Sequence, residues 1–272
     1  MKNTLLFVLA TIATLAVALV LRAVPLGDTT SEPSAGSVFV DGEDLVYQVS
    51  WTFLKLGTIH IKTSDTFKAI AYIDSYEGLP VVDLHSIHYT EMDSTFHTKH
   101  GYAIDKDGND WKGLRYNLDA SNSRVSIERL FQKNPTTQPY KVEANDSIRL
   151  KPSTFVDGLA IGYLPRLFIH ETKTLNVQTL LKGDLGVTTF YFTNEGTTES
   201  IDALDNPVRV VKVEGTTNAV GVFGMTGDFT GWFSDDAAAV PIKGKLKVLL
   251  GNVTVELIKW NRKGWSPPTG SD

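Results

Sequence analysis

Apolar residues alternate with polar ones at a period of two along most of this 272-residue chain, and turn-forming residues interrupt the alternation at short intervals. Such a pattern is typical of antiparallel strands that bury one face. The pattern therefore predicts an all-β protein, in which an antiparallel curved sheet closes into a soluble barrel or sandwich. The expected strands are residues 45–53, 58–63, 69–75, 95–104, 113–118, 124–131, 174–181, 187–193, 208–215, 229–234 and 242–259.

Glycine, asparagine and aspartate mark the turns between these strands. The expected turns are residues 106–109, 182–184, 194–196, 205–207 and 251–252, the last of which divides the final strand region into a hairpin. Two stretches depart from the pattern. Residues 132–148 are polar and contain prolines, which predicts a loop. Residues 154–167 have mixed spacing and contain Pro165, which predicts one short helix or turn across an end of the sheet.

The sequence LLFVLATIATLAVALVL at residues 5–21 carries no charge and lies between Lys2 and Arg22. Its length falls between the apolar core of a signal peptide and a membrane-spanning helix. We therefore expect residues 1–23 to be a signal peptide or an N-terminal membrane anchor that exports the protein from the cytoplasm. Residues 24–37 are expected to be a flexible tether, 38–264 a single β domain, and 265–272 a polar tail.

Charge and composition narrow the classes of partner. The net charge of −5 offers no basic field for phosphates, so no nucleic acid is expected to bind, and membrane contact is expected only through residues 1–23. The chain has no cysteine, which excludes disulfides, thiolate metal sites and thiol nucleophiles. Charges on both faces of expected strands, such as Glu128 and Arg129 in the strand at residues 124–131, disfavour lipid-facing strands.

Aromatic residues are the first candidates for ligand binding. Tyr47, Trp51 and Phe53 alternate along the first expected strand and share one face. Such residues either fill a core or, in a wide barrel, line a cavity. The candidate residues for an apolar or glycan ligand are Tyr47, Trp51, Phe53, Tyr191 and Trp232.

Histidines are the second group of candidates, because four of the six fall between residues 85 and 100 with acidic residues nearby. Imidazole and carboxylate groups are common zinc ligands, which makes His85, His88, His97 and His100 candidate metal ligands. His85 and His88 are three residues apart, however, as are His97 and His100. The two histidines of each pair would therefore point to opposite faces of a strand. Ordinary surface histidines are the alternative interpretation, and no cofactor is expected.

Three segments in order resemble a known family: EDLVYQVSWTFLKLG at residues 43–57, DGLAIGYLPR at 157–166, and TGWFSDD at 230–236 followed by VPI and GNVTVEL. The chain is similar to the bacterial exported proteins of domain of unknown function family 3108. The resemblance implies a mainly antiparallel β protein of the bacterial cell envelope and supplies no reaction. Residues 237–239 are alanines, where the family usually carries a basic residue.

These observations and the resemblance predict an exported protein of the periplasm or cell envelope that holds an apolar or glycan ligand in a β cavity, and they favour a binding protein over an enzyme. Two alternatives stay open. One is a metal-dependent hydrolase that uses the segment from His85 to His100, and the other is a structural scaffold that binds protein partners in an envelope complex.

Overall fold

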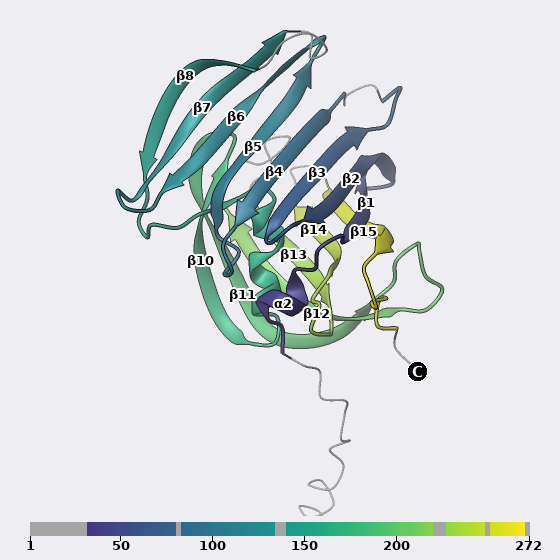
Figure 1. Ribbon diagram of the computed structural model, residues 1–272. Helices are drawn as coiled ribbons and strands as arrows, with labels where there is room; N and C mark the ends of the chain where they lie inside the picture. Colours follow the sequence, from purple (N-terminus) through teal and green to yellow (C-terminus); the bar gives the residue numbers. More distant parts are fainter. Residues whose placement is uncertain (1–31, 80–82, 134–139, 220–226, 248–250, 270–272) are drawn as a thin grey trace, which may run out of the picture. The chain divides into compact units, whose positions relative to one another are not determined.

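A single sheet of 15 strands forms most of the structure (Figure 1). This computed structural model describes residues 32–79, 83–133, 140–219, 227–247 and 251–269. The strands are β1 (Asp44–Trp51), β2 (Leu54–Ser64), β3 (Lys68–Ser75), β4 (His85–Met92), β5 (Thr98–Asp107), β6 (Asp110–Asp119), β7 (Arg124–Lys133), β8 (Lys141–Arg149), β9 (Val156–Asp157), β10 (Thr172–Leu181), β11 (Asp184–Glu199), β12 (Val208–Thr217), β13 (Gly227–Ser234), β14 (Pro241–Lys247) and β15 (Asn252–Asn261).

Strands that follow one another in the sequence pair antiparallel from β1 to β8 and from β10 to β15, and β15 returns to pair with β1. The exception is β9, which pairs parallel with β10. Strands β8 and β9 are therefore the two ends of the sheet, and the described residues show no pairing between them. The predicted all-β curved sheet is confirmed, and it stays open at these ends.

The main hydrophobic core lies between two halves of the sheet, β1–β8 and β10–β15, which face each other (Figure 1). Ala71 of β3 and Val213 of β12 belong to this one cluster. Between them lie Val156, Tyr163 and Leu164, from a segment that runs through the interior. The segment fills the space that two facing sheets would otherwise have to fill with their own side chains.

This interior segment corresponds to residues 154–167, for which the sequence predicts a short helix or turn. It contains β9 and two short 3-10 helices, η1 (Ala160–Gly162) and η2 (Leu164–Leu167). Pro165 lies in the first turn of η2, where its missing N–H costs no hydrogen bond. The segment passes through the core rather than across an end of the sheet as predicted. The mixed spacing of its apolar residues agrees with this path, because it places buried side chains on several sides of the segment.

The sequence prediction missed β4 as a separate strand and assigned β8 to a loop. Strand β8 pairs with β7 from Arg124–Arg149 to Phe131–Lys141, yet its side chains from Lys141 to Asp146 are all exposed. An end strand without a buried face has no need for alternating apolar residues. The period-two signal is therefore absent from a segment that is nonetheless a strand.

The borders of the β domain also differ from the sequence prediction. Helix α2 (Ala35–Val38) begins inside the predicted tether, where Ser34 and Ser37 form a capping box. Val38 is fully buried in the main core. In the predicted polar tail, Trp265 Nε1 donates a 2.8 Å hydrogen bond to Asp236 Oδ2 and Thr269 pairs with Val208. Parts of both flanking segments are thus bound to the sheet. The predicted turn at residues 194–196 is a bulge within β11.

Candidate functional site

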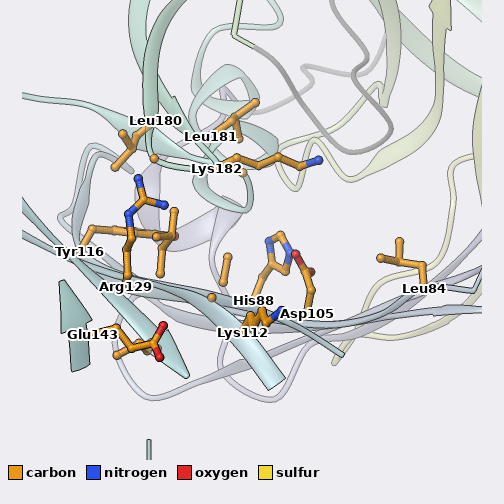
Figure 2. Close-up of a pocket in the computed structure, with 16 residues that line it drawn as sticks. Leu84, His88, Asp105, Lys112, Tyr116, Arg129, Glu143, Leu180, Leu181 and Lys182 are labelled. Carbon is orange, nitrogen blue, oxygen red and sulfur yellow. The ribbon is translucent and has the colours of Figure 1, made fainter. Parts of the chain in front are cut away.

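A cavity of about 440 Å³ lies between the inner faces of β4–β7 and the turn that joins β10 to β11 (Figure 2). Its apolar wall is made mainly of five leucines, Leu84, Leu114, Leu130, Leu180 and Leu181. Its polar lining residues include His88, Asp105, Lys112, Arg129, Glu143 and Lys182. A site with apolar walls and a few polar groups is the usual composition of a small-molecule pocket.

The floor of the cavity follows from strand register. His88 of β4 lies opposite Ala103 of β5, Ala103 lies opposite Leu114 of β6, and Leu114 lies opposite Arg129 of β7. Residues directly opposite each other in neighbouring strands point to the same face of a sheet. These four side chains therefore form one row on the inner face, although 41 positions separate the first from the last in the sequence numbering.

The roof of the cavity is set by a tight hairpin turn. Only Lys182 and Gly183 separate β10 from β11, and both have positive φ, as a two-residue type I′ turn requires. The turn lies against the opposite wall, because a Cβ atom added to Gly183 would be 3.1 Å from Leu114 Cδ1. This turn was expected from the sequence, but its place above β6 was not.

His88 is part of a chain of polar contacts along the floor. Its Nε2 lies 3.1 Å from Ser86 Oγ, and Ser86 Oγ donates a hydrogen bond to Asp105 Oδ1. Burial lowers the pKa of His88 below its usual value of 6.5, while the negative charges of Asp105 and Asp157 act in the opposite direction. The imidazole is therefore neutral at neutral pH.

Asp157 fixes the interior segment at the side of the cavity. Its Oδ1 accepts hydrogen bonds from the backbone N–H groups of Leu159 and Ala160, at 2.9 and 2.8 Å. Its Oδ2 accepts a 2.9 Å bond from the hydroxyl of Tyr116, which also lines the cavity. Burial and the neighbouring carboxylate raise the pKa of Tyr116 well above 10. Tyr116 thus stays a neutral donor and ties β6 to η1.

The cations of the cavity differ in their partners. Lys112 forms an exposed ion pair with Asp107, which does not line the cavity. Neither Arg129 nor Lys182 has a carboxylate within ion-pair distance among the residues described here. The Arg129 side chain points from the floor toward Leu180, and Lys182 extends over the cavity from the roof (Figure 2). The charges are thus spread along the walls rather than gathered at one point.

The family described as "Protein of unknown function (DUF3108)" matches residues 46–258. The chain belongs to this family. All the residues of the cavity lie within the matched range of this DUF3108 protein. Among curated proteins, no match is found.

One solved structure has a similar fold. It is described as a β-barrel-like protein of domain of unknown function DUF1849 from Brucella abortus, and it superposes with a TM-score of 0.53 at 9% sequence identity. The alignment covers 82% of the DUF3108 chain and 98% of the other chain. At this identity the likeness concerns the fold alone.

The aromatic residues predicted to bind a ligand are dispersed in the DUF3108 structure. Tyr47 is buried, its hydroxyl donates a 3.1 Å bond to Pro241 O, and the cavity beside it measures about 150 Å³. Trp232 is buried in a second core cluster, and Tyr191 is 43% exposed. None of these three lines the larger cavity.

The other two predicted aromatics lie at the end of β1. Trp51 is half-buried at its last position. Thr52 follows with a φ of 55°, which begins the turn into β2, so Phe53 lies beyond the strand and is 94% exposed. Phe53 therefore does not continue the buried face that alternation predicts for it.

The four candidate metal ligands have separate surroundings. His85 pairs with Asp74 and Asp83, His97 with Thr95, and His100 with Glu91. Only His88 lines the large cavity. In the described ranges, no three His, Cys, Asp or Glu side chains are grouped closely enough to hold a metal ion. The structure therefore brings no shared metal site together from these histidines.

Sequence reasoning missed most residues of the cavity. Asp105, Arg129 and Leu180 lie on three strands that are not neighbours in the sequence, and each has an unremarkable local context. His88 was selected only because of the histidines near it. The useful signal was the turn at residues 182–184, because a two-residue hairpin fixes where its flanking leucines point.

Proposed function

We propose that this DUF3108 protein is a non-enzymatic envelope protein that holds a ligand with an apolar body in the large cavity. The observation that supports the proposal is a cavity of about 440 Å³ with five leucines in its wall. Pockets for small molecules typically measure about 300–1,000 Å³. The cavity beside Tyr47, at about 150 Å³, falls below that range.

The polar groups of the site favour binding over catalysis. Ser86 has its hydroxyl directed to Asp105, and His88 contacts that same hydroxyl, so Ser86 lies between the acid and the base. In a hydrolytic triad the histidine occupies the middle position and the serine faces the substrate. The arrangement here orients His88 and leaves Ser86 buried.

Binding is tested with the fluorescent probe N-phenyl-1-naphthylamine, whose emission rises in apolar surroundings. We expect saturable binding to the full-length protein. Ala103→Leu fills the floor of the cavity and should weaken probe binding about tenfold or more, because the added methyl groups take space that the ligand needs.

Ala203→Leu is the matched control, since Ala203 is exposed between β11 and β12 and does not line the cavity. It should leave probe binding unchanged. Circular dichroism establishes that both variants fold. Absence of saturable binding, or equal weakening by the two substitutions, would overturn the proposal.

We also propose that residues 5–21 direct the protein out of the cytoplasm. Their uninterrupted apolar sequence supports this, and they lie outside the described residues. Within the described ranges, no helix has the length and apolar character needed to cross a membrane. Cell fractionation followed by N-terminal sequencing tests the proposal. Met1 on a membrane-bound protein indicates an anchor, a new N-terminus between residues 19 and 37 indicates cleavage, and a full-length cytosolic protein contradicts export.

A scaffold role is less well supported. It requires an apolar patch or an open sheet edge for a partner. Strand β8 provides an edge, but Lys141, Glu143 and Asp146 are exposed along it. Charged residues on an end strand oppose the addition of another strand.

A further inference from the structure

The hydrogen bonds of Ser86 determine which nitrogen of His88 carries the proton. Ser86 Oγ contacts Asp105 Oδ1 and the Ile104 carbonyl oxygen, the latter at 3.3 Å. A carboxylate and a carbonyl can only accept hydrogen bonds, so the single hydroxyl proton is directed to one of them. Ser86 Oγ is then an acceptor toward His88 Nε2, 3.1 Å away. His88 Nε2 therefore carries the proton, and Nδ1 holds a lone pair.

That lone pair faces open space. Nδ1 has no hydrogen-bond partner among the described residues, and His88 lines the cavity. Gly158 of the interior segment approaches this nitrogen, because a Cβ atom added there would be 3.8 Å from Nδ1. Because glycine has no side chain, nothing from this position covers the nitrogen. An acceptor directed into a mostly apolar cavity selects a ligand that supplies a donor.

We propose that His88 Nδ1 accepts a hydrogen bond from a hydroxyl group on the ligand, so that the cavity takes an apolar molecule that bears an alcohol. The inference rests on the proposed function. It names the part of the ligand that the polar floor recognises, while the leucines contact the apolar body.

The charges around His88 favour a neutral ligand group at Nδ1 over an anionic one. Asp105 and Asp157 act on His88 from β5 and from the interior segment, and both are negative. A carboxylate placed at Nδ1 would meet the lone pair and these two charges. Arg129 and Lys182 also line the cavity, so a carboxylate that binds there instead is the competing outcome.

The test compares two isomers, 1-decanol and methyl nonyl ether, as competitors of N-phenyl-1-naphthylamine at pH 8. They have the same atoms, but only the alcohol can donate a hydrogen bond. On the wild-type protein we expect decanol to compete about tenfold better, which corresponds to one hydrogen bond in a site of this kind.

His88→Phe removes the acceptor and should bring the two competitors within about twofold of each other, chiefly by weakening decanol. His88→Gln keeps an amide oxygen and should restore part of the preference. A purely structural role for His88 would change both competitors equally.

The outcomes separate the two proposals. If the probe does not bind saturably, the proposed function fails. If the probe binds and both isomers compete equally on the wild type, only the role of His88 fails. Tighter competition by decanoate than by decanol would assign the polar end of the ligand to Arg129 or Lys182 and would overturn the inference.

Discussion

Arg166 and Glu43 form an ion pair in the interior, with 3.6 Å between Nη1 and Oε1 and only 1% of each side chain exposed. Arg262 donates a second, hydrogen-bonded contact to Glu43 Oε2. The three residues come from η2, from the residue that precedes β1, and from the residue that follows β15. Arg166 also donates to the Ala238 carbonyl oxygen at 2.8 Å. This cluster joins the interior segment to both ends of the β domain.

Removing one member of the buried cluster should be strongly destabilising. Arg166→Met leaves the Glu43 carboxylate with one fewer cation in a site without solvent, and such uncompensated burial costs about 3–5 kcal/mol. Urea unfolding followed by tryptophan fluorescence measures the loss. Asp202→Asn is the control, because the Lys55–Asp202 pair is 61% and 81% exposed and should contribute less than about 1 kcal/mol. Similar losses for both variants would show that Arg166 is not paired in the interior.

The contacts of Asp157 predict a second stability effect. Tyr116→Phe removes one donor from a buried carboxylate, and Asp157→Ala removes the acceptor for two backbone N–H groups as well. We expect a loss of about 1–3 kcal/mol for the phenylalanine variant and a larger loss for the alanine variant. Urea unfolding of both proteins and of the double variant checks this. Additive losses would contradict a direct contact, since residues that interact show coupling.

The lowered pKa of His88 predicts a dependence of stability on pH. The unfolded chain takes up a proton near pH 6.5, but the folded protein does so only at lower pH. Stability from neutral His88 is therefore complete above about pH 6.5 and falls as the pH drops toward the folded pKa. His88→Phe should lose this component.

The measurement is the difference in urea midpoint between wild type and His88→Phe from pH 8 to pH 5. His97→Asn serves as a reference for a histidine away from the cavity. Burial lowers the pKa of His97 as well, but His97 does not line the cavity. A difference that is constant with pH would show that His88 titrates alike in the folded and unfolded chain.

Two glycines, one on β5 and one in η1, should respond in opposite ways to alanine. A Cβ atom at Gly101 would lie 2.4 Å from the Tyr89 carbonyl oxygen and 2.9 Å from Tyr116 Cε2, so Gly101→Ala should cost about 1–3 kcal/mol through overpacking. At Gly162 nothing lies within 4 Å, and Gly162→Ala should be neutral or stabilise by about 0.4–1 kcal/mol. Thermal unfolding of both variants compares them. Equal melting temperatures would mean that β4 and β5 can separate to accommodate the methyl group.

Much of the fold could be predicted from local patterns. Alternation identified strands such as β7 and β10, whose inner faces are buried, and the glycine turn at Lys182 and Gly183 placed a hairpin correctly. Strand β8 was lost because all of its central side chains are exposed. The periodic signal measures one-sided burial rather than strand pairing, so it fails at the end of a sheet.

The candidate site was less predictable. Tyr47 and Trp232 lie on buried faces, as their aromatic character suggests, but they belong to a packed core. Whether an inner face lines a cavity depends on what fills the space opposite. Here the segment with Tyr163 and Leu164 fills the main interior, and the remaining space lies beside His88.

The sequence by itself determined the antiparallel strands, the hairpin turns and the family, because these depend on side-chain period and on residues that are near one another in the chain. Only the tertiary structure decided that Glu43, Arg166 and Arg262 share one buried cluster, and that His88 and Leu180 share one cavity. Both arrangements arise where the interior segment passes between the two halves of the sheet. That path is set by packing between distant segments, which leaves no periodic trace in the sequence.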